Sequence, residues 1–401
     1  MSARSAEQAP TDQELRLFDG GPPLRVLRLW GRFDPDHQHV LRRALIVVGV
    51  GWLPLLLLLA LLSLTAGRDD VWQAFLRDAS VHARSLLVAP LLVLAEAVCI
   101  PRLGELAHTF RERELLPASA LPGYERVVRS IQWLRDWWLI EALALVLAYA
   151  MAILIVQTVP ASYLPNWHQA AGNAPMGRSL ASWWHALVSL PLLLILMLGW
   201  CWRVLLWALF LWRVSRLDLQ LVAAHPEGAA GLMFLSHSLS SFALLGAAIG
   251  IIVAATELGH LLAGGTIAPE LLGRVALGTV AFALVVFVAP LLSFCTPLLR
   301  TWRHDVQAYG ALAQRVGVSL EDRWMRAPPS PETADPLSSP DFSAVTDLFQ
   351  TVEKAYGLRM VPVELRSLLP LAVATALPFG VVALTLVPFD KVLEKVLGMF
   401  L

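Results

Sequence analysis

The sequence predicts an all-α, polytopic membrane protein with seven transmembrane helices. Of its 401 residues, 57% are hydrophobic and 15% are charged, whereas soluble domains carry about 25% charged residues. The apolar residues are gathered in runs long enough to cross the hydrocarbon core of a bilayer, which takes about 20 residues. The formal net charge is zero, so the composition gives no reason to expect nucleic acid as a partner.

Seven apolar runs meet this length requirement. They are residues 44–66, 85–103, 136–159, 183–203, 242–264, 275–299 and 367–388. The second is the weakest, because it carries Glu96 and is interrupted by Pro90 and Pro101. Membrane helices tolerate such prolines, since neighbouring groups satisfy the freed backbone.

Arginine and lysine predict the orientation of these spans. They are concentrated in every second segment outside the membrane, beginning with residues 1–43. By the positive-inside rule the N-terminus is cytoplasmic, and an odd number of spans places the C-terminal tail outside. The first apolar run starts only at Ala44, behind a charged head, so no secretory signal peptide is predicted.

Several spans are predicted to continue into the cytoplasm and form a helical bundle there. After the sixth span, helical spacing places apolar side chains on one stripe: Leu299, Trp302, Val306, Tyr309, Leu312 or Ala313, and Val316. After the fourth span the apolar pattern continues to Val222, which predicts one helix over 183–222. The second and third spans also extend inward.

The chain therefore divides into four parts. These are a cytoplasmic N-terminal segment (1–43), a six-helix membrane domain with its extensions (44–299), cytoplasmic helices (300–366), and the seventh span with a short outer tail (367–401). Residues 327–340 contain five prolines and predict a linker. An amphipathic helix is expected to follow, capped by Asp341.

Ionisable groups at membrane depth are costly and mark candidate functional residues. In the predicted spans these are Glu96, Glu141, Glu257 and His260. Glu96 has two possible partners. One is Glu141, with which it would share a proton, and the other is an arginine of another helix. Glu257 and His260 lie three residues apart, on one helical face, and either line a water-filled cavity or have a structural role. Arg203 is interpreted as an anchor at the inner interface.

The polar stretch 218–241 is predicted to be an elbow between two helices, or alternatively a gate. Its candidate residues are His225, Pro226, Glu227, Gly228 and Gly231. We expect Pro226 to end the preceding helix and Glu227 to lie in the first turn of the next. The two glycines would then share a helical face. As a gate, His225 and Glu227 would join Arg213 or Arg216.

Motifs of catalysis are absent from the sequence. It contains no H-E-x-x-H, no G-x-S-x-G and no nucleotide-binding glycine pattern. Its three cysteines, Cys99, Cys201 and Cys295, all lie in apolar runs, which argues against a disulfide framework or a cysteine metal site. We therefore expect neither an enzyme nor a cofactor or bound metal.

The layout resembles the insect odorant-receptor type of ligand-gated channel. The shared features are seven spans with the N-terminus inside, inward extensions, and a short helix leading into the last span. The resemblance implies subunits joined through a cytosolic anchor bundle, with the last span lining the pore. That span, residues 367–388, is uncharged, and Pro378 and Gly380 would bend it.

The expected function is therefore an oligomeric ion channel or passive transport path. The abundance of alanine, leucine and arginine over lysine suggests a bacterial inner membrane. Expected partners are the lipid bilayer, further copies of the chain, and ions or a small ligand. The alternative is a non-conducting membrane scaffold or sensor whose cytoplasmic bundle docks a soluble partner.

Overall fold

The computed structural model describes residues 14–20, 37–159, 165–169, 178–326 and 340–386. These residues form helices, turns and one isolated bridge between Gln169 and Arg178, which confirms the all-α prediction. Most of the predicted linker (327–339), much of the N-terminal segment and the outer tail lie outside the described residues.

Seven helical stretches are long and apolar enough to span a membrane, which confirms the predicted number. They are Val40–Ala66, Ala79–Glu112, Trp138–Thr158, Leu180–Val214, Met233–Leu262, Pro269–Arg326 and Leu365–Leu386. The first three stretches contain α3 (His37–Gly51) and α4 (Leu53–Ala66); α6 (Ala79–His82), η1 (Ala83–Val88) and α7 (Ala89–Glu112); and α9 (Trp138–Thr158). The fourth and fifth contain α10 (Leu180–Trp184), η4 (His185–Ser189) and α11 (Leu190–Val214); and η5 (Met233–Ser236), α12 (His237–Ser241) and α13 (Ala243–Leu262). The sixth contains α14 (Pro269–Val288), η6 (Ala289–Phe294), α15 (Cys295–Glu321) and η7 (Asp322–Arg326), and the seventh is α17 (Leu365–Leu386).

Local sequence explains where these helices begin and end. α4 starts beside Pro54, at a position where a missing backbone N–H costs nothing. It ends at Gly67, whose left-handed φ of 61° lets its N–H reach the Ser63 carbonyl. The Asp78 carboxylate accepts the Val81 N–H and so caps α6.

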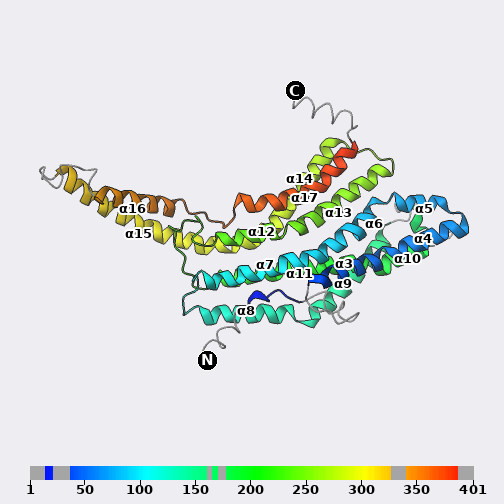
Figure 1. The fold of residues 1–401 in the computed structure, drawn as a ribbon, viewed down its shortest axis with the longest axis horizontal. Helices are drawn as coiled ribbons and strands as arrows, with labels where there is room; N and C mark the ends of the chain where they lie inside the picture. The colour runs from blue at the N-terminus through cyan, green and yellow to red at the C-terminus, as the bar shows by residue number, and fades with distance from the viewer. Residues whose placement is uncertain (1–13, 21–36, 160–164, 170–177, 327–339, 387–401) are drawn as a thin grey trace, which may run out of the picture.

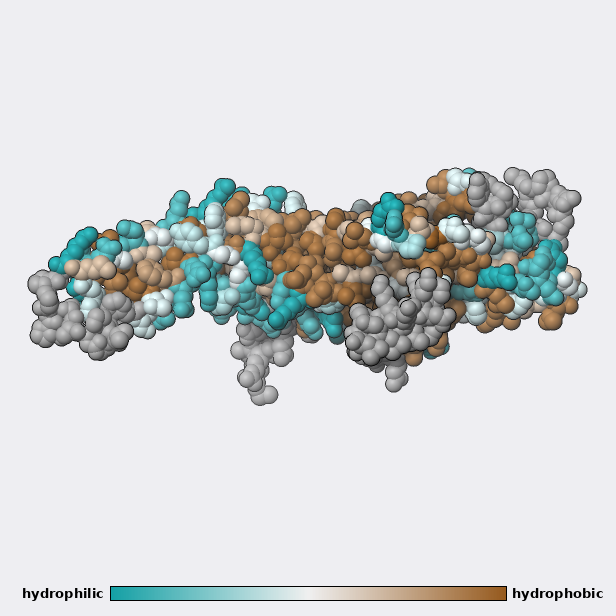
Figure 2. All heavy atoms as spheres, turned by 90° about the horizontal axis from the view of Figure 1, so that it is seen from above, coloured by the Kyte–Doolittle hydropathy of each residue, from teal (hydrophilic) through white to brown (hydrophobic). Residues whose placement is uncertain are grey.

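The spanning helices form two layers (Figure 1). One contains α12, α13, α14 and α17, and the other contains α3, α7, α9 and α11. α7 contacts α12 and α13, which joins the layers. α15 projects beyond both layers together with α16 (Pro340–Tyr356), and we call this helical pair the arm. The end of the molecule bearing the arm is the arm end. The opposite end, with α5 (Asp69–Leu76), is the loop end. Apolar residues dominate the middle of the view in Figure 2.

The arm is a helical pair whose inner faces are apolar. The side chains of the predicted α15 stripe from Trp302 to Val316 are half-buried, apart from the exposed Leu312. The Trp302 indole N–H donates to the Tyr356 carbonyl over 3.4 Å. A β-carbon on Gly310 would lie 3.1 Å from the Tyr356 hydroxyl, so the helices approach closely there.

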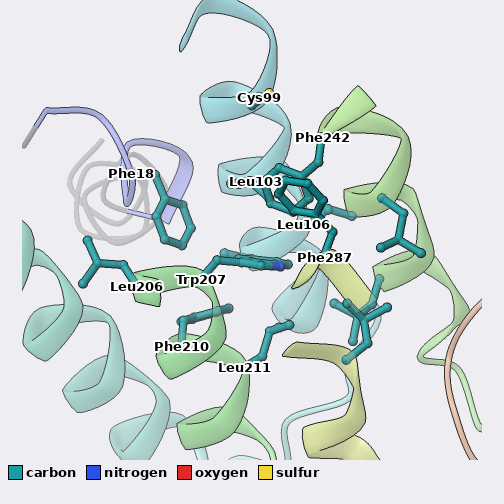
Figure 3. Close-up of a cluster of buried hydrophobic side chains, with 14 of the residues drawn as sticks. Phe18, Cys99, Leu103, Leu106, Leu206, Trp207, Phe210, Leu211, Phe242 and Phe287 are labelled. Carbon is teal, nitrogen blue, oxygen red and sulfur yellow. The ribbon is translucent and has the colours of Figure 1, made fainter. Parts of the chain in front are cut away.

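An aromatic core joins the N-terminal segment 14–20 to α11 (Figure 3). The Phe18 ring packs edge-on against Trp207 and Phe210, with centroids 5.7 and 6.2 Å away. Tyr124 of α8 (Leu121–Arg135) and Phe110 of α7 pack against Phe210 as well. Phe18, Phe210 and Trp207 are fully buried, so residues far apart in sequence share one core.

The N-terminal segment 14–20 docks into this core through its backbone and one carboxylate. A β-carbon on Gly104 would lie 2.1 Å from the Leu15 carbonyl oxygen, so only glycine admits the segment. Glu14 is buried and pairs with His108 at 2.8 Å and Arg111 at 3.1 Å. Burial raises the pKa of the Glu14 carboxyl, against the opposing effects of His108 and Arg111.

One helix is shorter than predicted. α11 ends at Val214 and not at Val222, so the single helix predicted over 183–222 is wrong beyond that residue. The backbone turns at once, because the N–H groups of Arg216 and Leu217 bond to the carbonyls of Arg213 and Val214. The stretch that follows is held by tertiary contacts described below.

Candidate functional site

Glu96 lies between two arginines from different helices. Its Oε2 is 2.6 Å from Arg43 Nη2, and its Oε1 is 3.0 Å from Arg203 Nη1. The three side chains are 5%, 11% and 3% exposed for Glu96, Arg43 and Arg203. Of the two partners predicted for Glu96, the arginine is the one in contact. We call Arg43, Glu96 and Arg203 the charge cluster.

The charge cluster carries a surplus of positive charge with unsatisfied donors. Among the described residues, the Nε, Nη1 and Nη2 atoms of Arg203 have no hydrogen-bond acceptor, although Nη1 is in ion-pair contact with Glu96. The Arg203 guanidinium also lies 5.1 Å from the Trp200 ring centroid. Buried charges without full pairing are expensive, so this cluster is a functional candidate.

The interpretation of Arg203 as an interfacial anchor is wrong. An anchor extends its charged head to water, whereas Arg203 is buried and faces Glu96. The sequence carried a weak signal for this pairing, since Arg203 and Glu96 are both charged residues within apolar runs. Arg43 directly precedes the first predicted span, so its position in the sequence gives no sign that it reaches Glu96.

A polar pocket of about 1010 Å³ opens at the loop end. It lies among α6, η1, α9, η4 and α13, and we call it the arginine pocket. Its ionisable lining residues are Arg77, Asp78, Arg84, His168, Arg178, His185 and His260. Three arginines against one aspartate leave the pocket positive before any histidine is protonated, which favours an anionic ligand.

The single carboxylate of this pocket is already engaged. Asp78 Oδ2 accepts the Trp167 indole N–H at 3.0 Å, and Oδ1 accepts the Val81 N–H at 3.2 Å. Arg178 donates to the Val156 carbonyl at 2.6 Å. Arg84 makes no hydrogen bond or ion pair to a described residue, and Asp78 acts on it only at a distance. Arg77 also has no side-chain partner among the described residues, but it is exposed, whereas Arg84 is half-buried. Arg84 is therefore the arginine best placed to receive an anion.

Two π-helical segments shape the floor of the arginine pocket. Arg84 lies in η1 (Ala83–Val88) and His185 in η4 (His185–Ser189). π-helical turns are rare and occur frequently at functional sites. Arg84 and His185 also line a second, narrow pocket beside Val47 and Ala89. Its cavity volume is about 10 Å³, enough for about one water, so the space constricts towards the charge cluster.

His168 closes one side of the arginine pocket. Its ring stacks on Trp167 with centroids 3.6 Å apart, and its Nδ1 lies 3.0 Å from the Ser182 hydroxyl. Burial, assisted by the charges of His185 and Arg178, lowers the pKa of His168 from 6.5 to about 3. His168 is therefore neutral at physiological pH.

The other predicted acidic residues do not join Glu96. Glu141 is half-buried in the first turn of α9. Glu257 and His260 lie on the last turns of α13, as predicted, but only His260 lines the arginine pocket. His260 is exposed and Glu257 is half-buried. Among the described residues, the ion-pair partners of Glu96 are therefore arginines, and Glu257 and His260 are not among them.

Within the elbow 218–241, residues 218–232 form a tightly held loop, and residues 233–241 are helical. Glu227 Oε1 is 2.6 Å from Arg113 Nη1, so its arginine partner is neither of the two predicted. His225 Nδ1 accepts the Glu227 N–H at 3.3 Å, and the Gly228 carbonyl accepts the Arg359 N–H at 2.8 Å. These contacts tie the loop to α7 and to the chain leading into α17.

The helical roles predicted for this loop are wrong. Pro226 and Glu227 lie in turns, and the next helical stretch begins at Met233. Gly228 and Gly231 have φ of 74° and 88°, so they supply left-handed backbone and do not share a helical face. Sequence alone placed a turn here correctly, but it missed the contacts that require one.

α17 packs on α13 with one face and exposes another. Pro378 is half-buried inside the helix, and Gly380 is exposed with no atom within 4 Å of a β-carbon there. The exposed positions include Leu369, Val373, Leu377 and Val381. This outer face is apolar and suits lipid or another apolar surface.

A scan against models of protein families, a search of the curated proteins and a search of the solved structures each found no match. The resemblance to odorant-receptor channels therefore rests on layout alone, and function must be argued from the sites themselves.

Proposed function

We propose that this chain gives a small anion a passive path across a membrane, with the arginine pocket as its entrance. The observation that carries the proposal is the positive lining of that pocket around Arg84, which has no ion-pair partner among the described residues. Glu96, Glu141 and Glu257 do not line this pocket, whereas three arginines do, so its lining favours an anion over a cation.

The charge cluster is the second anion-binding site along this path. Arg84 precedes Glu96 by 12 residues on one helical stretch, about 18 Å at 1.5 Å per residue. The narrow pocket lies in between, on the Val47 and Ala89 side. The described conformation is closed in this scheme, and an anion passes when Arg43 and Arg203 exchange Glu96 for the ligand.

The orientation follows from the basic residues. The positive-inside rule places the arm end in the cytoplasm and the arginine pocket outside, in a bacterial inner membrane. The exposed apolar faces of α9 and α17 are available to lipid and to further copies of the chain. A homo-oligomer is part of the proposal.

The experiment is anion efflux from proteoliposomes that contain the purified full chain. Chloride, acetate and inorganic phosphate are the probes, with potassium and valinomycin supplying the counter-current. We expect efflux of at least one probe. Arg84→Gln should slow this efflux about tenfold, which corresponds to a loss of about 1.4 kcal/mol in the free energy of interaction with the anion. Arg274→Gln is the matched control, since Arg274 is exposed near the loop end on α14 and does not line the pocket.

A second function is favoured by the arm. α15 and α16 project beyond the bundle and carry exposed apolar side chains, among them Val318 and Phe349. A scaffold or sensor would use this arm to dock a soluble partner. If calorimetry shows that the protein binds an anion but no efflux is measured, the sensor function is favoured. If the folded protein shows neither anion binding nor efflux, the anion proposal is overturned and the scaffold function is favoured.

A further inference from the structure

An apolar groove of about 710 Å³ separates α11 from α13 and α14. Met197, Val204 and Ala208 of α11 line one wall, with Ile249 of α13 and Phe282 of α14 opposite. Few polar groups line this groove, so water molecules inside it would make few hydrogen bonds to the protein. Its lining matches a hydrocarbon chain.

A polar pocket adjoins this groove at the arm end. It also measures about 710 Å³, and its polar lining residues include Ser215, Arg216, Asp218, Thr296, Arg300 and Thr301. Trp212 and Ser293 line both cavities, so the groove and the polar pocket adjoin at these two residues. Together they form one amphipathic site, apolar in one half and polar in the other.

The polar half is set up for an anion. Arg216 and Arg300 make no ion pair among the described residues, and Asp218 is the single carboxylate of the lining. The Arg216 guanidinium lies over the Trp212 ring, 4.7 Å from its centroid, which fixes its position. Two guanidinium groups and three hydroxyls can together bind a phosphate.

The junction of the two halves coincides with an edge of the apolar surface. Trp212 and Leu292 are 47% and 49% exposed, and the exposed residues that follow them include Arg216 and Arg300. Tryptophan and arginine at such an edge are typical of the membrane–water interface. A molecule in this site would hold its polar end at the depth of lipid headgroups.

We infer that the groove and the polar pocket together bind one anionic phospholipid. One of its acyl chains lies along Val204, Ala208 and Phe282, and its phosphate lies between Arg216 and Arg300. This site is distinct from the arginine pocket, which is at the other end of the molecule, and the inference does not depend on the proposed transport.

The experiment is native mass spectrometry of the delipidated full chain in detergent. Phosphatidylglycerol and phosphatidylcholine with identical acyl chains compete for retention. We expect phosphatidylglycerol to be preferred, and each of Arg216→Gln and Arg300→Gln to weaken its retention about tenfold, equivalent to about 1.4 kcal/mol. Arg303→Gln, exposed on α15 and outside the pocket, should leave retention unchanged.

A second pair of variants addresses the groove. Ala208→Phe fills the apolar half and should displace both lipids, whereas Leu277→Phe on the exposed face of α14 should displace neither. If Ala208→Phe does not fold, the arginine variants decide alone, because Arg216 and Arg300 are exposed. Equal retention of the two lipids, or a preference unchanged in the double arginine variant, would overturn the inference. Glycerol phosphate binding as tightly as phosphatidylglycerol would assign the site to a soluble phosphate ester instead.

Discussion

Gly250 of α13 faces the backbone of Thr375 in α17, and a β-carbon on Gly250 would lie 2.2 Å from the Thr375 carbonyl oxygen. One turn earlier, a β-carbon on Gly246 would lie 2.5 Å from the Thr375 hydroxyl and 2.7 Å from Leu371. Such glycine pairs four residues apart let membrane helices approach at backbone distance. The last spanning helix is therefore held by close packing.

Gly250→Ala should destabilise the protein, because the methyl group can be accommodated only if α13 and α17 separate. Overpacking of this kind costs about 1–3 kcal/mol, which should lower the thermal unfolding midpoint in detergent. Gly278→Ala on α14 is the control, since no atom lies within 4 Å of its β-carbon position. Equal midpoints for the two variants would show that the helices do not touch at Gly250.

Glu96→Leu should be more harmful than Arg203→Met. The first leaves two buried arginines without a counter-charge, and such losses cost about 3–5 kcal/mol. The second leaves the Arg43–Glu96 pair intact and removes the guanidinium whose donors lack acceptors. Unfolding midpoints of both variants test this order. An equal or reversed order would mean that Arg203 is better compensated than its contacts indicate.

Acid should destabilise the loop end through His168. Its pKa is about 3 in the folded protein against 6.5 ordinarily, so the unfolded chain binds a proton that the folded chain does not. Stability is full above pH 6.5 and falls as the pH drops towards 3, with a slope of up to about 1.4 kcal/mol per pH unit. His168→Gln should flatten the pH profile of the unfolding midpoint, and His304→Gln, at an exposed site on the arm, should not. An unchanged profile in His168→Gln would count against burial of a neutral ring.

Glu114→Gly should stabilise the end of α7. Glu114 is exposed and has a φ of 53°, a left-handed conformation that costs about 1 kcal/mol for a residue with a β-carbon. Glu114→Ala retains that cost and is the matched control. A midpoint raised in both variants would trace the gain to the lost charge and not to the backbone.

The spans could be predicted because length and hydrophobicity decide them locally. Each predicted run overlaps one observed helix, and the predicted continuation of the sixth span is helical and contacts α16. The end of α11 could not be predicted, because residues 215–222 remain apolar at intervals. What ends the helix is tertiary: the Ala223 N–H donates to Asp305 and the Gln220 N–H to the Leu115 carbonyl.

The candidate sites were predicted only in part. Glu96 stood out as a charge within an apolar run, and an arginine was one of its two open partners. The arginine pocket was missed, because Arg77, Arg84 and Arg178 come from separate segments and each alone is ordinary near the end of a span. Only the fold brings them together around His168.

The burial of Phe18 sets an order for assembly. Its ring partner Trp207 lies 189 positions later in the chain, which takes about 10–40 s to synthesise at 5–20 residues per second. During that interval the N-terminal segment has no place to dock, and Leu17 and Phe18 remain uncovered while the first four helices enter the membrane. Closure of the aromatic core is thus a late event in biogenesis, and it reports that the fourth helix has been inserted in the correct register.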